Sequence, residues 1–206
     1  MRLAKISFSL ILCLFVTALF AQNKYEGDYT KLDTTVSKKE LTESNTVVEF
    51  FSYGCPHCYD FNSELSQWEQ SHPSVKLVRM PVAFGGSWDI YARAYYVADV
   101  YGKLDVMSSK IFTAIHVQHK NLGNEDAMQA FFAENGITKA QFDKVYGSAG
   151  LNKILKDTQA VFKETGATGV PALLVEGQYL ISPTRKIGLN GMLDVADYLL
   201  KQSDAK

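Results

Sequence analysis

Hydrophobic and polar positions change their period along this chain, and the changes predict the order of its elements. Thr46–Phe51 is β-branched and aromatic and apolar on both faces except at Glu49, which is typical of a central strand covered on both sides. Apolar residues from Phe61 to Trp68 then recur every three or four positions, so we expect a helix that ends before Pro73. Val75–Met80 predicts a second strand. Strand, helix and strand in this order indicate the parallel crossover unit of α/β folds.

The pattern between Ser87 and Gly166 is entirely helical. Apolar residues recur with the period of a helix, and residues that begin and end helices lie between them. The predicted helices are Trp88–Tyr101, Val106–Val117, one that begins at the cap Asn124 and stops at Gly136, one that begins with the capping box of Thr138 and Gln141, and Leu151–Thr165. This run of helices predicts an insertion that interrupts the sheet domain.

Strands return after the helical segment. Ala172–Val175 and Gln178–Ile181 flank the dipeptide Glu-Gly, a short hairpin signal, and Gly191–Lys201 predicts a last helix. Tyr25–Asp33 is polar with isolated aromatic residues and is a candidate for a short edge strand. The fold class is therefore α/β, with an inserted all-helical domain.

The first 21 residues have the pattern of a secretory signal peptide. Arg2 and Lys5 give a positive start, Phe8–Phe20 is mostly apolar, and Ala21 is a small residue at which cleavage can occur. Cleavage after Ala18 is an alternative. The apolar run is shorter than the roughly 20 residues of a spanning helix, which favours a signal peptide over a retained membrane anchor. We therefore expect export to an oxidising compartment, a bacterial periplasm.

Composition and charge narrow the class of protein. Hydrophobic residues make up 47% of the chain, which indicates a globular protein with a substantial core. The formal net charge is only −1, so charge gives no reason to expect nucleic acid or an anionic membrane as a partner.

The cysteines carry the strongest chemical signal. Cys13 lies in the expected signal peptide, so Cys55 and Cys58 are the two cysteines of the mature chain. A disulfide between them closes a very small loop and restrains the unfolded chain only slightly. Such a bridge is better explained by chemistry than by stability.

The position of the pair assigns a role to each cysteine. Cys55 lies between a strand end and a helix start, where free N–H groups and the helix dipole lower the pKa of a thiol. Pro56 suits the first helical position, and His57 adds a positive charge or a donor. We expect Cys55 to be an exposed attacking thiol and Cys58, one turn into the helix, to be the resolving thiol. A stabilised Cys55 thiolate makes the disulfide a stronger oxidant.

A metal site is the main alternative use of these residues. Cys55, Cys58 and His57 could ligate zinc or copper, joined by His116 and His119, which are spaced i, i+3 in a predicted helix. Zinc sites usually have four ligands, often from two paired motifs, and the chain has no second pair. We therefore expect no metal.

Glu49 is an acidic residue in an apolar strand. It shares a face with Val47 and Phe51, so we expect it to be buried beneath the cysteine pair, with Arg79 of the neighbouring strand as its partner. Two interpretations remain open: a group that manages protons during thiol exchange, and an ion pair at a strand edge.

Two segments together carry a family resemblance. Val48–Tyr59, with its Cys-Pro-His-Cys motif, and Gly169–Ala172, with the helical insertion between them, resemble the DsbA family of periplasmic thiol–disulfide oxidoreductases on the thioredoxin fold. The resemblance covers essentially the whole mature chain. It implies that Pro171 is cis and faces Cys55, and that Val170 presents its backbone to an extended substrate.

The resemblance also implies an activity and its partners. The protein would donate its Cys55–Cys58 disulfide to newly exported, cysteine-containing proteins, as a monomer without a cofactor. A DsbB-like, quinone-linked membrane oxidase would reoxidise it. Relatives commonly have lysine at the position of Arg79, and because arginine cannot release a proton, a proton role would fall to Glu49 or water.

The implied division of the chain has four parts. They are a signal peptide (1–21), a first thioredoxin-like part (22–86), an inserted helical domain (87–157) and a second thioredoxin-like part (158–206). Two rival functions remain. A disulfide isomerase on the same fold would usually carry a dimerisation domain, and the segment before Thr46 is too short for one. A metal-binding or chaperone module would use the cysteines only as ligands.

Overall fold

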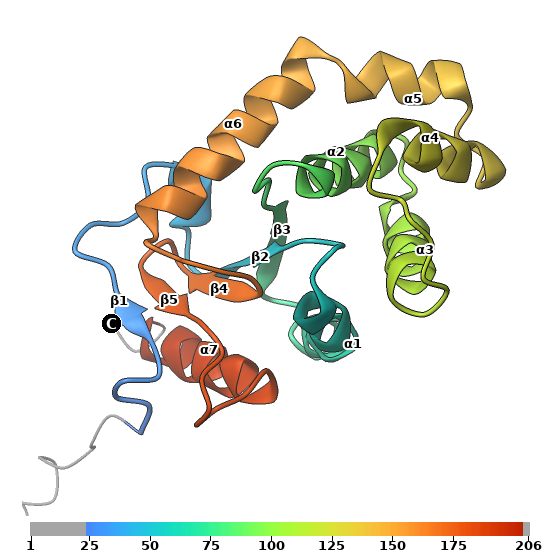
Figure 1. The fold of residues 1–206 in the computed structure, drawn as a ribbon. Helices are drawn as coiled ribbons and strands as arrows, with labels where there is room; N and C mark the ends of the chain where they lie inside the picture. Colours follow the sequence, from blue (N-terminus) through green and yellow to red (C-terminus); the bar gives the residue numbers. More distant parts are fainter. Residues whose placement is uncertain (1–23, 204–206) are drawn as a thin grey trace, which may run out of the picture.

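The computed structural model describes residues 24–203 (Figure 1). The expected signal peptide, with its cleavage site and Cys13, lies outside the described residues. Within 24–203, no helix combines the length and the apolar character that crossing a membrane requires.

A five-stranded mixed sheet forms the centre of the fold, in the order β1-β5-β4-β2-β3. The strands are β1 (Thr30–Lys31), β2 (Thr46–Phe51), β3 (Lys76–Pro81), β4 (Ala172–Val175) and β5 (Tyr179–Ile181). β2 runs parallel to β3 and antiparallel to β4, and all six of its residues are buried. Its central position and its burial on both faces are those predicted from its continuous apolar pattern.

The hairpin between β4 and β5 turns where it was expected. Glu176 and Gly177 have φ angles of 50° and 65° and form the centre of a β-turn in which the Gln178 N–H donates to the Val175 carbonyl (3.0 Å). Only glycine fits the second position, because a Cβ there would lie 2.6 Å from the Thr42 side chain. A short 3-10 helix, η1 (Lys39–Leu41), lies before β2 and was not predicted.

Helices cover both faces of the sheet (Figure 1). On one face lie α1 (Pro56–Ser71) and α7 (Asn190–Ser203), whose apolar residues pack on the sheet around Val47 and Leu173. On the opposite face α6 (Ala149–Glu164) packs Val161 and Phe162 against residues of β2 and β4. The helix predicted to have Pro56 at its first position and to end before Pro73 is therefore confirmed as α1.

The chain between β3 and β4 forms helices without a strand, as predicted. In addition to α6 these are α2 (Ser87–Val100), α3 (Leu104–His116), α4 (Glu125–Glu134) and α5 (Lys139–Tyr146). Asn124 caps α4 and Thr138 forms the expected capping box with Gln141. The fold class, an α/β fold with a helical insertion, is confirmed.

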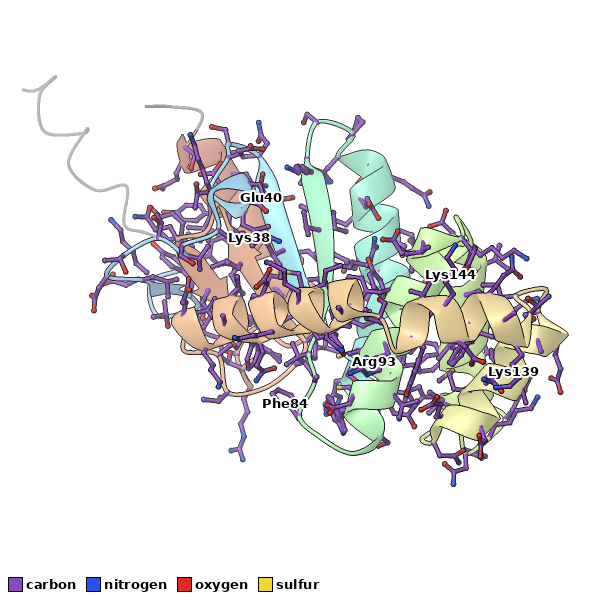
Figure 2. The ribbon with its side chains drawn as sticks, turned by 90° about the horizontal axis from the view of Figure 1, so that it is seen from above. Lys38, Glu40, Phe84, Arg93, Lys139 and Lys144 are labelled. Atoms are coloured by element: carbon purple, nitrogen blue, oxygen red, sulfur yellow. The ribbon has the colours of Figure 1, made fainter. Side chains whose placement is uncertain are left out.

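α6 links the helical segment to the sheet. It continues from α5 and crosses above the strands (Figure 2). Arg93 of α2 holds the junction of α5 and α6, because its guanidinium donates to the Tyr146 carbonyl (2.7 Å) and to the Asn152 side chain (2.8 Å). The expected boundary at residue 157 falls within this helix.

Candidate active site

The turn between β2 and α1 positions the cysteine pair. The Cys55 N–H donates to the Ser52 carbonyl (3.1 Å), and the Ser52 hydroxyl accepts the Gly54 N–H (3.2 Å). A Cβ at Gly54 would lie 2.7 Å from the ring of Tyr91 in α2, so the turn passes too close to that ring for any larger residue. Pro56 is the first residue of α1, where a missing N–H costs no hydrogen bond.

The Cys55 sulfur caps the N-terminus of α1. It accepts the Cys58 N–H at 3.4 Å, and its thiol donates to the Val170 carbonyl, also at 3.4 Å. Both cysteines are free thiols in this structure. Cys55 is only 6% exposed and Cys58 is fully buried, so Cys55 is more covered than expected. The reason is its place between the first turn of α1 and the segment before β4.

The surroundings move the pKa values of the two thiols in opposite directions. The pKa of Cys55 falls from 9.0 to about 6, first because the Cys58 thiol donates a hydrogen bond to it. The N–H groups of Cys58 and His57 and the charge of His57 act in the same direction, while partial burial opposes them. The pKa of Cys58 is raised, because burial and the neighbouring Cys55 disfavour a second anion. At neutral pH the pair therefore carries its negative charge on Cys55.

His57 lies at the surface of the site. Its side chain is 74% exposed, and its Nδ1 is 4.0 Å from a carboxylate oxygen of Asp60. Its influence on Cys55 comes from its backbone N–H and its charge rather than from a side-chain hydrogen bond.

Glu49 lies in a buried cluster of charges. As predicted from strand register, it pairs with Arg79: its carboxylate is 3.3 Å from Nε, and the same guanidinium donates to Glu69 of α1 at 2.9 Å. Glu49 is 2% exposed, and burial raises its pKa from 4.5 to about 7 against the attraction of Arg79. The neighbouring negative charges of Glu69 and Cys55 add to the rise.

A cavity of about 530 Å³ connects this cluster to polar side chains of two helices. It is lined by Glu49, Arg79, Glu69, Asn62 and Ser66, with Tyr53, Asp105 and Ser108 among the residues on its α3 side. A cavity of this size has room for water, so the Glu49 carboxyl borders a space lined by polar side chains.

The segment before β4 meets the cysteine pair from the other side. The Val170–Pro171 peptide bond is cis, as the resemblance implied, and Pro171 is buried at the start of β4. The Val170 carbonyl accepts the thiol of Cys55. Two distant parts of the chain thus meet at the cysteines: the turn from β2 to α1, and residues 170–171.

Sequence reasoning missed one contact of the site. His116, the last residue of α3, donates from Nε2 to the Tyr53 carbonyl at 2.8 Å, and its ring stacks on Tyr59 with centroids 5.0 Å apart. From the sequence, His116 is either a metal ligand or, as we expect, an ordinary histidine at the surface or the edge of the core, because a stacking contact across 57 residues leaves no local pattern.

The expected pairing of His116 with His119 on one helix is wrong. α3 ends at His116, and His119 lies beyond it with a φ of 55°. Among the residues that the structure describes, no three His, Cys, Asp or Glu side chains gather in a way that could hold a metal ion.

Comparison with known proteins gives a consistent result. The sequence model of the family described as DSBA-like thioredoxin domain matches residues 46–191. The thiol:disulfide interchange protein DsbA of Pseudomonas aeruginosa is 30% identical, over 93% of this chain and 97% of the relative. Its namesake from Azotobacter vinelandii is 35% identical, over 88% of this chain and 85% of that protein. The crystal structure of P. aeruginosa DsbA superimposes with a TM-score of 0.80 at 31% identity, over 86% of this chain and 93% of that one.

Proposed function

The chain belongs to the family of DSBA-like thioredoxin domains, and from this premise we propose how its cysteine pair transfers a disulfide. The protein is a protein-disulfide oxidoreductase that introduces disulfide bonds and acts through a redox-active disulfide. Each residue of the site has a distinct part in this transfer.

The exchange begins with the oxidised protein. A substrate thiolate attacks the Cys55 sulfur, the Cys55–Cys58 bond breaks, and Cys58 leaves as a thiolate that takes up a proton. A second thiolate of the substrate then attacks the substrate sulfur of the mixed disulfide and releases the Cys55 thiolate. Two electrons pass from the substrate dithiol to the cysteine pair, and the substrate gains a disulfide. If the second substrate thiol is absent, Cys58 attacks Cys55 and releases the partner.

The low pKa of Cys55 drives this direction of transfer. The hydrogen bond from the Cys58 thiol and the N–H groups at the start of α1 stabilise the Cys55 thiolate, which makes it a good leaving group in the second step. Because this stabilisation exists only in the reduced protein, it favours reduction of the Cys55–Cys58 disulfide. Pro56 begins the helix that supplies these N–H groups, and exposed His57 adds its charge.

Glu49 supplies or accepts the proton that the exchange moves. The leaving Cys58 thiolate needs a proton because it is fully buried, and the charge of Glu49 acts on it. With a pKa of about 7, Glu49 holds a proton for part of the time near neutral pH. Arg79 stays charged, and its ion pair with Glu49 holds the Glu49 carboxylate in position.

Residues 170–171 bind the substrate chain. The Val170 carbonyl oxygen lies 3.4 Å from the Cys55 sulfur, which places the Val170 backbone beside the reacting atom. An extended peptide that pairs with the Val170 backbone would bring its own cysteine to Cys55, and backbone pairing demands little of the peptide sequence. Pro171 fixes the start of β4 behind this position.

The setting of the reaction completes the proposal. Residues 1–21 are a signal peptide, and the mature protein works in the periplasm as a monomer on newly exported, cysteine-containing proteins, without metal or nucleic acid. A DsbB-like, quinone-linked membrane oxidase restores the disulfide. Residues 22–86 and 158–206 form the thioredoxin-like domain, and residues 87–157 form the inserted helical domain.

The observation that carries these roles is the Cys55 sulfur bound at the N-terminus of α1 beside a fully buried Cys58. It predicts that the thiolate absorbance of the reduced protein titrates with a midpoint near pH 6. Cys55→Ser should remove this titration, and Cys58→Ala should keep a Cys55 titration, shifted upward by loss of the thiol donor. A midpoint near about 8.5, the value of a free cysteine, would overturn the assignment.

A further inference from the structure

His116 touches both flanks of the cysteine motif from outside it. Its Nε2 hydrogen-bonds the carbonyl oxygen of Tyr53, two residues before Cys55, at 2.8 Å. Its ring lies on that of Tyr59, the residue after Cys58, with an interplanar angle of 22°. A carbonyl oxygen can only accept, so Nε2 carries a proton. One side chain of α3 therefore spans the turn before the pair and the first turn of α1.

Phe112 lies one helical turn before His116 and meets the same two tyrosines. Its ring is 4.9 Å from that of Tyr53, edge to face, and 6.0 Å from that of Tyr59. Residues four apart share one face of a helix, so Phe112 and His116 form a continuous contact surface. Phe112 contributes apolar packing, and His116 adds the directional hydrogen bond that sets where the Tyr53 carbonyl points.

The helical segment makes further contacts with the turn before Cys55. The Tyr53 side chain is fully buried, and its hydroxyl lies 2.6 Å from the Ser108 hydroxyl of α3. Gly54 lies against the ring of Tyr91 in α2. The position of the Cys55 backbone, directly after this turn, is therefore set by α2 and α3 as well as by the sheet.

Small movements of this turn matter for Cys55. Its sulfur is stabilised by the thiol and N–H of Cys58 and by the N–H of His57, all of which belong to α1. The strength of each contact depends on the distance between the sulfur, carried by the turn, and the donors, carried by the helix. A contact that binds the turn to the helix preserves that distance.

We propose that His116 is a positioning residue for the exchange reaction: it holds the turn before Cys55 against the first turn of α1, and so keeps the Cys55 sulfur on the donors of the helix. The proposal rests on the role of Cys55 as the exchanging thiolate. His116 touches neither sulfur. It gives the helical insertion a direct part in setting the oxidising strength of the site.

The test variant removes the hydrogen bond to the Tyr53 carbonyl and keeps an aromatic ring at position 116. His116→Phe retains an aromatic ring for Tyr59 but cannot donate to the Tyr53 carbonyl. The charged and titrating groups that act on Cys55, namely His57, Glu49 and Cys58, are unchanged, so a shift reports placement. We expect the midpoint of the Cys55 thiolate absorbance to rise by roughly 0.5 to 1 pH unit. The equilibrium constant for reduction by glutathione should fall by about threefold to tenfold.

The chain offers a matched control at the other end of α1. The ring of His72 also stacks on an aromatic residue, Trp68, with centroids 4.6 Å apart, and its Nδ1 lies 2.8 Å from the Trp68 carbonyl. His72→Phe should lower the midpoint of thermal unfolding but leave the Cys55 titration and the glutathione equilibrium unchanged.

Two further variants keep the test decisive. His116→Gln restores a donor, so its titration should lie between that of the parent and that of His116→Phe. A larger shift in His116→Gln than in His116→Phe would overturn the role of the hydrogen bond. If His116→Phe does not fold, Tyr59→Leu provides the test, because it removes the ring on which His116 stacks. A rise in the midpoint of the Cys55 thiolate titration would support the proposal, and an unchanged midpoint would overturn it.

The outcomes separate this proposal from the proposed function. If Cys55 titrates near pH 6 both in the parent and in folded His116→Phe, the positioning role of His116 is wrong and the proposed role of Cys55 stands. Equal shifts of the Cys55 titration midpoint in His116→Phe and His72→Phe would likewise show that His116 contributes only to general stability. A parent midpoint near about 8.5 would instead overturn the proposed role of Cys55.

Discussion

The N-terminus of α1 and the buried middle of β2 shift the pKa values of acidic groups in opposite directions. At the helix start, hydrogen-bond donors lower the pKa of the Cys55 thiol from 9.0 to about 6. In the strand, burial raises the pKa of the Glu49 carboxyl from 4.5 to about 7, although Arg79 is in contact with it. The pKa values of the thiol and the carboxyl, which start at 9.0 and 4.5, are therefore brought close together near neutral pH.

The difference shows what decides a pKa in a protein interior. Both residues have little exposed surface, 6% for Cys55 and 2% for Glu49, but the Cys55 thiol is only partially buried, so the cost of desolvation is greater for Glu49. Cys55 receives donors from one helix end, whereas the cation beside Glu49 is shared with a second carboxylate, Glu69. Direct donors outweigh desolvation at the thiol, while desolvation outweighs the shared charge at the carboxyl.

The two groups also affect stability in different pH windows. Because the folded pKa of Cys55 is lowered, its contribution to the stability of the reduced protein is full above pH 9 and is lost as the pH falls through 6. Because the folded pKa of Glu49 is raised, its contribution is full below pH 4.5 and is lost as the pH rises through 7.

The largest expected effect comes from removing the Cys55 thiol itself. Cys55→Ala should reduce disulfide transfer to a peptide dithiol to the uncatalysed rate, because Cys58 is buried and its raised pKa leaves it protonated. Cys58→Ala should also stop turnover, but its Cys55 thiolate should attack a disulfide-bonded substrate, keep one substrate sulfur in a mixed disulfide and release the other as a thiolate. Non-reducing electrophoresis after incubation of the reduced variants with a disulfide-bonded substrate distinguishes the two. Capture by Cys55→Ala rather than by Cys58→Ala would reverse the assigned roles.

Removing the carboxyl gives the next largest effect, and the stability of the variant reports the pKa on which the proposed proton role depends. Glu49→Gln keeps the shape of the side chain and loses its ionisation. Relative to the parent, the free energy of unfolding of the variant should rise by roughly 3 kcal/mol between pH 4.5 and pH 7, because a carboxyl with a pKa of about 7 is costly to ionise inside the fold.

Urea unfolding of the oxidised proteins at a series of pH values measures this difference, since the disulfide prevents Cys55 from ionising. Any fixed cost of leaving Arg79 without its anion cancels in the pH dependence. A difference that stays constant from pH 4.5 to 7 would show that Glu49 has an ordinary pKa, and its proposed proton role would then be lost.

Much of this arrangement follows from local sequence. β2 was predictable with its bounds because its residues are apolar on both faces, and the parallel β2–β3 unit places Glu49 opposite Arg79 in register. The cap Asn124 and the turn at Gly177 were predictable because their backbone geometry requires particular residues.

The remaining features depend on contacts between distant segments. The Val170 carbonyl covers Cys55 across 115 residues, which is why an exposed thiol was expected and a buried one is found. The contact of His116 with Tyr53 joins two elements whose separation is set only by the packing of α3. Glu69 could be placed on α1 from its helical pattern, but its sharing of Arg79 requires the final distance between α1 and β3.

The smallest expected effect tests how Arg79 is shared between Glu49 and Glu69. Glu69→Gln leaves Arg79 to Glu49 alone and removes a nearby negative charge, so the pKa of Glu49 should fall. Because the Glu69 side chain is 40% exposed, water weakens its influence, and we expect a fall of a few tenths of a pH unit. Carboxyl-resolved NMR titration measures it. Glu43→Gln is the control, since Glu43 pairs at 3.0 Å with Lys76, another basic residue of β3, at the surface. If Glu69→Gln raises the pKa of Glu49, then Glu69 acts mainly by holding Arg79 in place rather than by competing for its charge.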